Sequence, residues 1–345
     1  MNRRWAGDVR YGIMKNGTYK AYVVREVEGG RFVGRAEEKD TADLPAGEVL
    51  VRVRYSSLNY KDALSASGNR GVTRRYPHTP GIDAAGLVEE SAVNEFVPGD
   101  EVTVCGYDLG MNTSGGFAQY VRVPASWVMK LTAGLTLKES MILGTAGFTA
   151  GVCVQELTTG LMPEQGEILV TGATGGVGSF AVGILAKLGY SVVAVSGKQD
   201  AEAFLKPLGA REILDRWAFT RRGSRALLRA RWAGVIDTVG GEILAAAIKS
   251  TQPLGVVTCC GNAASPELPL TVYPFILRGV TLKGIACQHY PLPMRKTILG
   301  RLANEWRLDH FADLHEEISL AELGDRIEQI LQGRLRRRAV INLDR

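Results

Sequence analysis

The chain has 345 residues, of which 46% are hydrophobic and 22% are charged. This length is enough for two domains of ordinary size, and the composition is typical of a soluble globular protein. A formal net charge of +5 is small for this length and argues against a nucleic-acid-binding protein. No run approaches the roughly 20 apolar residues that a membrane-spanning helix needs, and the basic N-terminus lacks the apolar core of a secretory signal. The five cysteines form no CxxC pair, so we expect reduced thiols in a cytoplasmic protein.

The first part of the chain is predicted to be rich in short strands. Alternating apolar and β-branched residues indicate strands over Tyr19–Val27 and Glu48–Leu58, with a polar loop between them. Three further stretches, broken by Gly and Pro, are typical of a small barrel-like β domain: Pro77–Glu90, Phe96–Gly106 and Gly115–Leu131. Residues 1–13 are expected to form a flexible extension.

Strands and helices alternate after about Leu137. Lys138–Leu157 is predicted to be a helix, and apolar strands then alternate with helices as far as Asn262. This rhythm predicts a parallel sheet covered by helices on both faces. From about His310 the pattern returns to short mixed segments, with a helix over 322–333 and a final strand over 338–343. We expect this end to rejoin the first domain.

A glycine-rich turn, TGATGGVG, occupies Thr171–Gly178 between a predicted strand and a predicted helix. Glycine permits the tight turn and lets backbone N–H groups approach a pyrophosphate, which the helix N-terminus then faces. A second strand at Val192–Val195 completes the context that this motif requires. The turn therefore predicts dinucleotide binding, with a purely structural turn as the alternative. The expected contacts are Gly175, Gly176, Val177 and Gly178.

The second strand ends in VVAVSGK, Val192–Lys198, where many dinucleotide-binding proteins carry an acid. An acid there binds the 2′-OH of NAD and repels a 2′-phosphate. Ser196, the N–H of Gly197 and Lys198 instead offer a hydroxyl, a backbone donor and a positive charge, which suit a phosphate. Arg216, after the next strand, would close the site from the side. The sequence therefore predicts NADPH; the alternative is that Lys198 is a solvated lysine at a helix start.

Further motifs run in order over nearly the whole chain after about Met14: SSLNYKDAL (Ser56–Leu64), PGIDAAG (Pro80–Gly86), ILGTAGFTA (Ile142–Ala150), VTGATGGVGSFAV (Val170–Val182), LGYSVVAVSGK (Leu188–Lys198), WAGVIDTVGG (Trp232–Gly241) and PFILRGVTLKGI (Pro274–Ile285). In these motifs the chain resembles the medium-chain dehydrogenase/reductase superfamily, and within it the zinc-free quinone-oxidoreductase-like branch that contains acrylyl-CoA reductase. The resemblance implies an α/β protein in which a GroES-like β-rich catalytic domain, 14–143 with 310–345, surrounds a Rossmann domain, 144–309. The Rossmann domain has a doubly wound parallel sheet and binds NADPH. Such proteins usually form homodimers or higher homo-oligomers.

Zinc is not expected. Zinc-dependent relatives carry a catalytic Cys, and a Gly-His-Glu where this chain has Gly81-Ile82-Asp83, together with a four-Cys lobe. None of these features is present, and the four histidines have no zinc-like spacing with cysteine. Without a Lewis acid, alcohol oxidation is disfavoured.

The polar cluster Asn59-Tyr60-Lys61-Asp62 follows a predicted strand, and the resemblance places Tyr60 beside the nicotinamide end of NADPH. We predict that Tyr60 orients cofactor and substrate and can donate a proton, and that Asn59 positions the substrate. Asp62 would cap the following helix. Lys61 would pair with an acid such as Asp83. The alternative is that Tyr60 only packs and Asn59 only caps.

More cofactor contacts are expected at the nicotinamide end. Thr145 and Thr149 flank a small-residue turn that lies near the nicotinamide in relatives, with a helix-packing glycine as the alternative. Gly261 and Asn262 end a strand, and ligands bind at the carboxyl ends of parallel strands. The resemblance adds Phe275, Ile276 and Cys287 as lining.

Two basic segments remain. Arg70 and Arg75 lie in a loop that the resemblance places at the rim of the substrate cleft, where coenzyme A phosphates would pass. A solvated basic loop is the alternative. The run RLRRR, Arg334–Arg338, is predicted to be a solvated edge beside the final strand rather than a nucleic-acid site.

Together these features favour NADPH-dependent reduction of the C=C bond of a small 2-enoyl-CoA, with acrylyl-CoA to propionyl-CoA as the best candidate. A hydride would add to the β-carbon of the thioester and a proton would reach its α-carbon. An NADPH:quinone oxidoreductase is the close rival. A non-catalytic NADPH-binding sensor is the rival from another class of protein.

Overall fold

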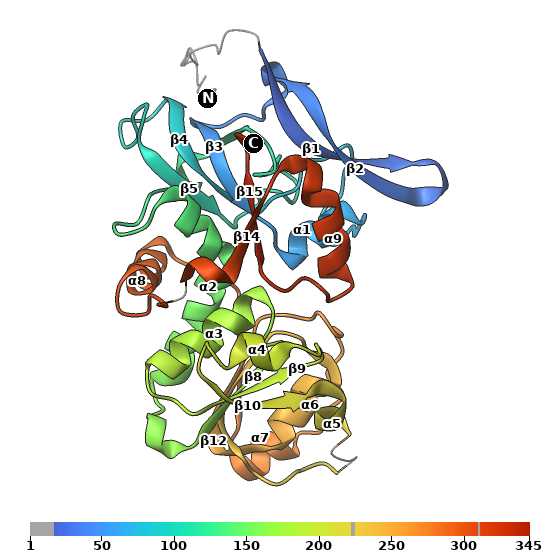
Figure 1. Ribbon diagram of the computed structural model, residues 1–345, viewed down its shortest axis with the longest axis vertical. Coiled ribbons are helices and arrows are strands. Elements are labelled where there is room, and N and C mark those ends of the chain that lie inside the picture. The colour runs from blue at the N-terminus through green and yellow to red at the C-terminus, as the bar shows by residue number, and fades with distance from the viewer. Residues whose placement is uncertain (1–16, 222–224, 310) are drawn as a thin grey trace, which may run out of the picture.

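The computed structural model describes residues 17–221, 225–309 and 311–345 and contains two lobes (Figure 1). The first lobe is built around a seven-stranded sheet and the second around a six-stranded sheet. Helix α2 (Leu137–Thr158) lies between the lobes and contacts elements of both. The predicted extension over residues 1–13 lies outside the described residues. None of the helices in the described ranges is long and apolar enough to cross a membrane.

The sheet of the first lobe combines strands from both ends of the chain. Its order is β14-β15-β3-β4-β5-β7, and β6 also pairs with β3. β15 (Arg338–Asn342) runs antiparallel to β3 (Val49–Ser57), so the C-terminal segment lies directly beside an N-terminal strand. The domain limits given above stay a prediction. The other elements of this lobe include β4 (Asp83–Ser91), β5 (Glu101–Cys105), β6 (Tyr120–Val123), β7 (Val128–Lys130), β14 (His315–Ile318), α1 (Tyr60–Ala66) and α9 (Leu323–Leu331).

The prediction of a polar loop between the first two predicted strands is wrong. β1 (Thr18–Val27) pairs with a second strand, β2 (Arg31–Asp40), in a continuous antiparallel register. Every side chain of β2 is exposed or half-buried, and the hairpin projects from the lobe (Figure 1). Backbone pairing rather than an apolar face defines this strand, so hydrophobic periodicity could not reveal it.

The second lobe confirms the predicted Rossmann architecture. Its strands are all parallel, in the order β10-β9-β8-β11-β12-β13. The order reverses between β8 and β11, and ligands bind beyond the carboxyl ends of the strands at such a point. The strands are β8 (Glu167–Thr171), β9 (Val192–Ser196), β10 (Ala210–Asp215), β11 (Trp232–Asp237), β12 (Thr251–Cys259) and β13 (Thr281–Gly284).

Both faces of this parallel sheet are buried. Ile168 and Val170 of β8 belong to a core with helices α2, α3 and α8, whereas Leu169 belongs to a second core with α6. Apolar side chains therefore point to both faces, which explains the continuous apolar runs in the sequence. The helices of this lobe are α3 (Gly176–Lys187), α4 (Ala201–Leu205), α5 (Arg216–Thr220), α6 (Gly241–Lys249), α7 (Tyr273–Arg278) and α8 (Leu292–Ala303).

Candidate active site

The glycine-rich turn between β8 and α3 is packed too closely for most side chains. A Cβ on Gly178 would lie 2.4 Å from the carbonyl oxygen of Gly172, and a Cβ on Gly172 would lie 2.3 Å from Thr238 Oγ1. Gly175, the residue before α3, is exposed. The turn therefore presents the free N–H groups of the helix start to a ligand, which fits a pyrophosphate. The contacts expected of Gly175, Gly176, Val177 and Gly178 stay a prediction.

The end of β9 brings together three of the groups expected around a 2′-phosphate. The Ser196 hydroxyl lies 3.2 Å from Thr174 Oγ1 and accepts a hydrogen bond of 3.2 Å from the backbone N–H of Lys198. Arg216 covers Gly197 so closely that a Cβ on this glycine would lie 2.8 Å from Arg216 Nε. A hydroxyl, a glycine backbone and a guanidinium therefore converge at the strand tip, as a phosphate site requires.

Lys198 is held by the C-terminal segment. Its ammonium group donates a hydrogen bond to the backbone carbonyl of Leu335, and the side chain is half-buried. Burial lowers the pKa of Lys198. The alternative of a fully solvated lysine therefore does not describe this residue.

Helix α2 breaks at Gly144, which has φ 47° and ψ −154°. The break turns Thr145 toward Asp83: its backbone N–H donates to Asp83 Oδ2 at 2.9 Å and its hydroxyl donates to Asp83 Oδ1 at 2.6 Å. A Cβ on Gly144 would lie 2.5 Å from Asp83 Oδ2. Gly144 is therefore needed to let Thr145 bind Asp83, and its role is not limited to helix packing. Thr149, one turn later, donates to the Thr145 carbonyl at 2.7 Å.

Asn59 is part of a buried polar network. Its Nδ2 donates to Asp83 Oδ2 at 2.8 Å, and its Oδ1 accepts from Arg338 Nη1 at 3.2 Å. Its backbone N–H donates to Asp62 Oδ2 at 2.8 Å, which confirms that Asp62 caps the start of α1. Because the Asn59 amide already has protein partners, the structure favours a positioning role. Its contact with substrate stays a prediction.

Asp62 is fully buried. Burial and the nearby Asp83 carboxylate raise the pKa of Asp62 to about 7, despite hydrogen bonds from the backbone of Asn59 and Ile82. A proton on this cluster is therefore exchangeable near neutral pH.

Tyr60, the first residue of α1, is half-buried, and its hydroxyl has no hydrogen-bond partner among the residues that the structure describes. The prediction that Lys61 forms an ion pair with Asp83 is wrong. Asp83 lies buried beneath α1, whereas Lys61 Nζ donates to Gln288 Oε1 at 3.0 Å. This bond joins α1 to the segment after β13. The Tyr60 hydroxyl, without a partner in the described residues, is available to a ligand.

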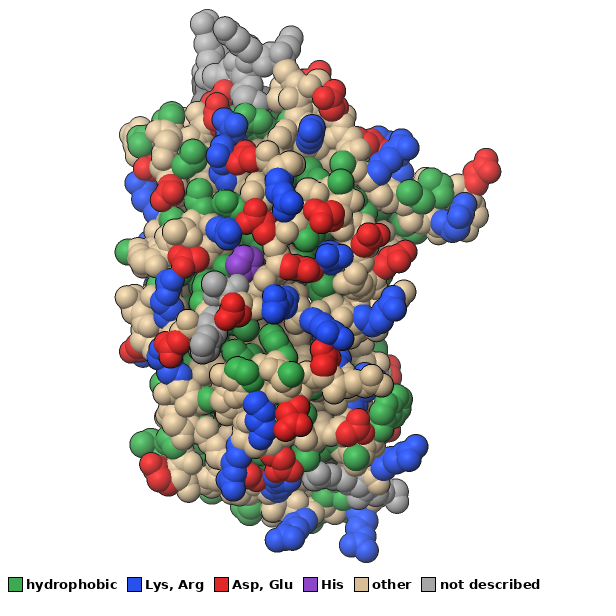
Figure 2. All heavy atoms as spheres, viewed as in Figure 1, with side chains coloured by type: hydrophobic (Ala, Val, Ile, Leu, Met, Phe, Trp, Pro, Cys, Tyr) green, Lys and Arg blue, Asp and Glu red, His purple; other side chains and the backbone are tan. Residues whose placement is uncertain are grey.

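The expectation of a solvated edge over Arg334–Arg338 is wrong for Arg338. This side chain is only 5% exposed and donates to Leu58 O and Ser57 Oγ, both at 2.8 Å. It was missed because its carbonyl and hydroxyl partners come from distant segments and carry no charge pattern. On the face in Figure 2, basic side chains alternate with acidic ones, which gives no support to a nucleic-acid surface there.

The remaining predicted residues fall into two groups. Cys287 is buried beside the Thr149 side chain, and burial raises the pKa of Cys287 to about 11, so its thiol is neutral. Gly261 packs tightly after β12, where a Cβ would lie 2.2 Å from the Thr238 carbonyl oxygen, and Asn262 beside it is exposed. These three residues stay candidates. Phe275 packs on the core with α6, and Ile276 is exposed on α7, so the lining role expected of these two residues stays a prediction.

The two arginines expected at the substrate rim differ. Arg70 contacts the β1–β2 hairpin. It forms an ion pair of 2.6 Å with Glu26, and its guanidinium stacks on the rings of Phe32 and Tyr76. Arg75 is exposed and has no ion pair or hydrogen bond within the described part of the chain. Arg75 is therefore the more available of the two to a substrate phosphate, and the role of both arginines stays a prediction.

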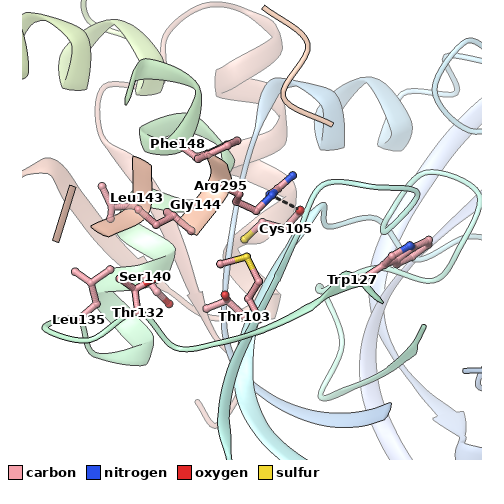
Figure 3. A pocket seen from close by; sticks show the side chains of 12 residues that line it. Thr103, Cys105, Trp127, Thr132, Leu135, Ser140, Leu143, Gly144, Phe148 and Arg295 are labelled. Carbon is pink, nitrogen blue, oxygen red and sulfur yellow. Dashed lines mark hydrogen bonds between the residues drawn. The ribbon is translucent and has the colours of Figure 1, made fainter. Parts of the chain in front are cut away.

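A narrow crevice with a volume of about 20 Å³ adjoins the break in α2 (Figure 3). It is lined by Gly144, Phe148 and Arg295, among others, and by none of the predicted site residues. Arg295 of α8 is buried and donates to the carbonyls of Cys105 at 2.9 Å and Cys287 at 3.0 Å. Arg295 thus fixes Cys287 against β5, a positioning function that no motif in the sequence signalled.

Comparison with known proteins supports the fold. The alcohol dehydrogenase GroES-like domain family matches residues 45–133, and the zinc-binding dehydrogenase family matches residues 176–303. The probable acrylyl-CoA reductase AcuI of Escherichia coli is 42% identical over 92% of this chain and 98% of the relative. The chain belongs to the medium-chain dehydrogenase/reductase superfamily. It is therefore an oxidoreductase.

Two further comparisons place this dehydrogenase/reductase in its branch. The putative quinone oxidoreductase YhfP of Bacillus subtilis is 43% identical over 88% of this chain and 92% of the relative. The crystal structure of E. coli YhdH with bound NADPH has a TM-score of 0.91 and 41% identity, and that of YhfP with bound NAD has a TM-score of 0.89 and 40% identity. Each covers 94% of this chain and 99% of the solved chain. The predicted resemblance to the acrylyl-CoA reductase and quinone-oxidoreductase branch is confirmed.

The zinc-binding dehydrogenase family is named for zinc, but this chain has Gly81-Ile82-Asp83 where zinc-dependent members carry Gly-His-Glu. Within residues 17–221, 225–309 and 311–345, no group of three or more His, Cys, Asp or Glu side chains could hold a metal ion. Asp83 is instead bonded to Ser57, Asn59 and Thr145.

Proposed function

We propose that this protein catalyses the zinc-independent, NADPH-dependent reduction of the activated C=C bond of a small 2-enoyl-CoA, with acrylyl-CoA to propionyl-CoA as the reaction. The observation that carries the substrate class is the match to E. coli AcuI over 92% of this chain and 98% of the relative. The cofactor choice rests on the tip of β9, where Ser196 and Arg216 converge and no acid ends the strand.

The residues around the two turns fit NADPH. The glycine turn and the N-terminus of α3 would hold the pyrophosphate, and Ser196, Lys198 and Arg216 would hold the 2′-phosphate. Thr145 and Thr149, fixed by the break in α2, would meet the nicotinamide end. NADPH supplies the hydride that an activated C=C bond accepts.

The protein's own contribution is to orient the thioester and to stabilise charge. Negative charge develops on the thioester oxygen during reduction, so a fixed hydrogen-bond donor near that oxygen lowers the barrier. The unpartnered Tyr60 hydroxyl is the candidate donor and a source of the proton for the α-carbon. The network of Asp83, Asn59 and Arg338 holds the start of α1, and hence Tyr60, in place. Arg75 at the rim would meet phosphates of coenzyme A.

Quinone reduction is the second candidate, because YhfP is 43% identical over 88% of this chain. It would use the same cofactor contacts with a flatter acceptor. Steady-state kinetics with NADPH and each of acrylyl-CoA, crotonyl-CoA and a simple quinone separate the two. Higher kcat/KM for acrylyl-CoA than for the quinone supports the enoyl reductase, whereas turnover of the quinone alone contradicts it.

We also propose that the protein is a homodimer. β13 pairs only with β12 among the described strands, so its outer edge is open. Large apolar side chains on the neighbouring strand β12 and on or just before α7, which contacts β12, are 63–81% exposed, namely Leu254, Val272, Ile276 and Leu277. An open edge next to exposed apolar residues favours pairing with a second copy. Sedimentation velocity should give a dimer that L254D/I276D converts to a monomer; a monomeric wild type contradicts the proposal.

A cytoplasmic location is proposed from the thiols. All five cysteines are free, and none pairs in a disulfide. Reduced thiols of this kind fit a reducing compartment.

A further inference from the structure

The basic run near the C-terminus packs against the tip of β9. Arg336 Nη1 lies 2.5 Å from Asp200 Oδ2, and the carbonyl of the preceding residue, Leu335, accepts the hydrogen bond from Lys198. Asp200 and Lys198 follow β9 in the second lobe, whereas Arg336 directly precedes β15 in the first. A segment of the first lobe therefore forms one wall of the proposed 2′-phosphate site.

Three cationic side chains surround this turn. Arg216 covers Gly197, Lys198 follows it, and Arg336 is near enough to Lys198 that its charge contributes to lowering the pKa of that lysine. Asp200 is the acid ion-paired with Arg336. The site thus holds more positive than negative charge, as a phosphate dianion requires.

The ion pair between Arg336 and Asp200 is accessible to exchange. The two side chains are 69% and 42% exposed, and exposed ion pairs contribute little to stability. A guanidinium forms stronger, two-pronged hydrogen bonds with a phosphate, whose charge exceeds that of a carboxylate. A 2′-phosphate at the tip of β9 would therefore draw Arg336 away from Asp200.

We propose that Arg336 is a further determinant of NADPH specificity, which binds the 2′-phosphate from the first lobe in competition with Asp200. This inference rests on the proposed use of NADPH. It gives the run RLRRR a function that its sequence pattern did not suggest. It also makes the cofactor site depend on both lobes.

The test compares two probes that differ only in the 2′-phosphate, adenosine 2′,5′-bisphosphate and 5′-AMP. Their Kd values are measured by isothermal titration calorimetry on the full chain, for wild type, R336A, D200N and the double variant. R334A is the matched control, because Arg334 belongs to the same run and hydrogen-bonds Gln332. The loss of one charged hydrogen bond in R336A should weaken the bisphosphate about tenfold. 5′-AMP and R334A should be unaffected.

The Asp200 variant separates specificity from structure. If Asp200 competes with the phosphate, D200N binds the bisphosphate more tightly, the opposite of R336A. If the ion pair only holds the two lobes together, R336A and D200N change the binding of both probes in the same way, which overturns the inference. The inference is also overturned if R336A has no effect once Asp200 is Asn, because Arg336 would then only screen the acid. A wild type that does not distinguish the probes contradicts the NADPH assignment itself.

Discussion

Arg338 and Asp83 approach each other inside the protein, with 4.0 Å between Nη2 and Oδ2 and side-chain exposures of 5% and 0%. Arg338 begins β15, near the C-terminus, and Asp83 begins β4. Through Asp83, the pair reaches Thr145 after the break in α2. One buried contact thus links the last strand of the chain to the helix that separates the lobes.

Replacing Arg338 should strongly destabilise the fold. Arg338→Met leaves Asp83 buried without its cation, and removing one member of a buried pair lowers the free energy of unfolding by about 3–5 kcal/mol. Urea unfolding of the full chain measures this change. The control is Arg337→Met, an exposed neighbour in the same run, which should change it by less than about 0.5 kcal/mol. Equal effects of the two variants would contradict the network.

Gly144→Ala should destabilise the protein, because it changes the residue at the break in α2. At φ 47° an alanine is strained, and its Cβ would lie 2.5 Å from Asp83 Oδ2. We expect a loss of about 2–4 kcal/mol in unfolding free energy and weaker cofactor binding, because Thr145 must move. Gly300→Ala in α8 is the matched control; its Cβ would meet nothing within 4 Å, so helix propensity should stabilise it by about 0.5–1 kcal/mol. A tolerated Gly144→Ala would show that the break is not required.

Asp62 should make stability depend on pH in a defined window. Its pKa is about 7 in the folded protein, above the value of about 3.9 for an unfolded aspartate. The folded state therefore binds this proton more tightly, and its contribution to stability is lost as pH rises from about 4 through about 7. Urea unfolding of wild type and Asp62→Asn at several pH values should show a steeper fall for the wild type in this window. Parallel curves would mean that Asp62 does not titrate there.

Tyr60→Phe tests the proposed donor. The hydroxyl has no protein partner in the described residues, so its removal should leave the unfolding free energy unchanged. Loss of a hydrogen-bond and proton donor should lower kcat/KM for the enoyl-CoA by about 100-fold. Unchanged turnover and unchanged NADPH affinity would reduce Tyr60 to a packing residue.

Local patterns predicted the second lobe well and the first lobe less well. Strands such as β8 are buried on both faces, and the glycine turn after it is a contiguous motif. β2 was missed because its stability comes from pairing with β1, and no apolar face marks it. Periodicity reports burial, so an exposed hairpin strand leaves no signal in it.

Prediction of the site from local sequence patterns has the same limit. Motifs pointed to Tyr60, Ser196 and Arg216 as candidates, because each lies in or directly after a short predicted element. Arg338 and Arg336 were hidden in one charge run, although one is buried and the other is exposed. Arg338 is buried because it begins β15 and meets partners more than 190 residues away, such as the carbonyl of Ile142. Such pairings depend on tertiary structure, and a local pattern does not contain them.

The most direct test of the account is the steady-state kcat/KM for acrylyl-CoA, measured by the loss of reduced nicotinamide absorbance with NADPH and, in parallel, with NADH. A simple quinone serves as the competing acceptor. The account predicts efficient turnover of acrylyl-CoA with NADPH and little with NADH or with the quinone. Turnover of the quinone alone would contradict the substrate, and equal use of NADH would contradict the role assigned to Ser196, Lys198 and Arg216.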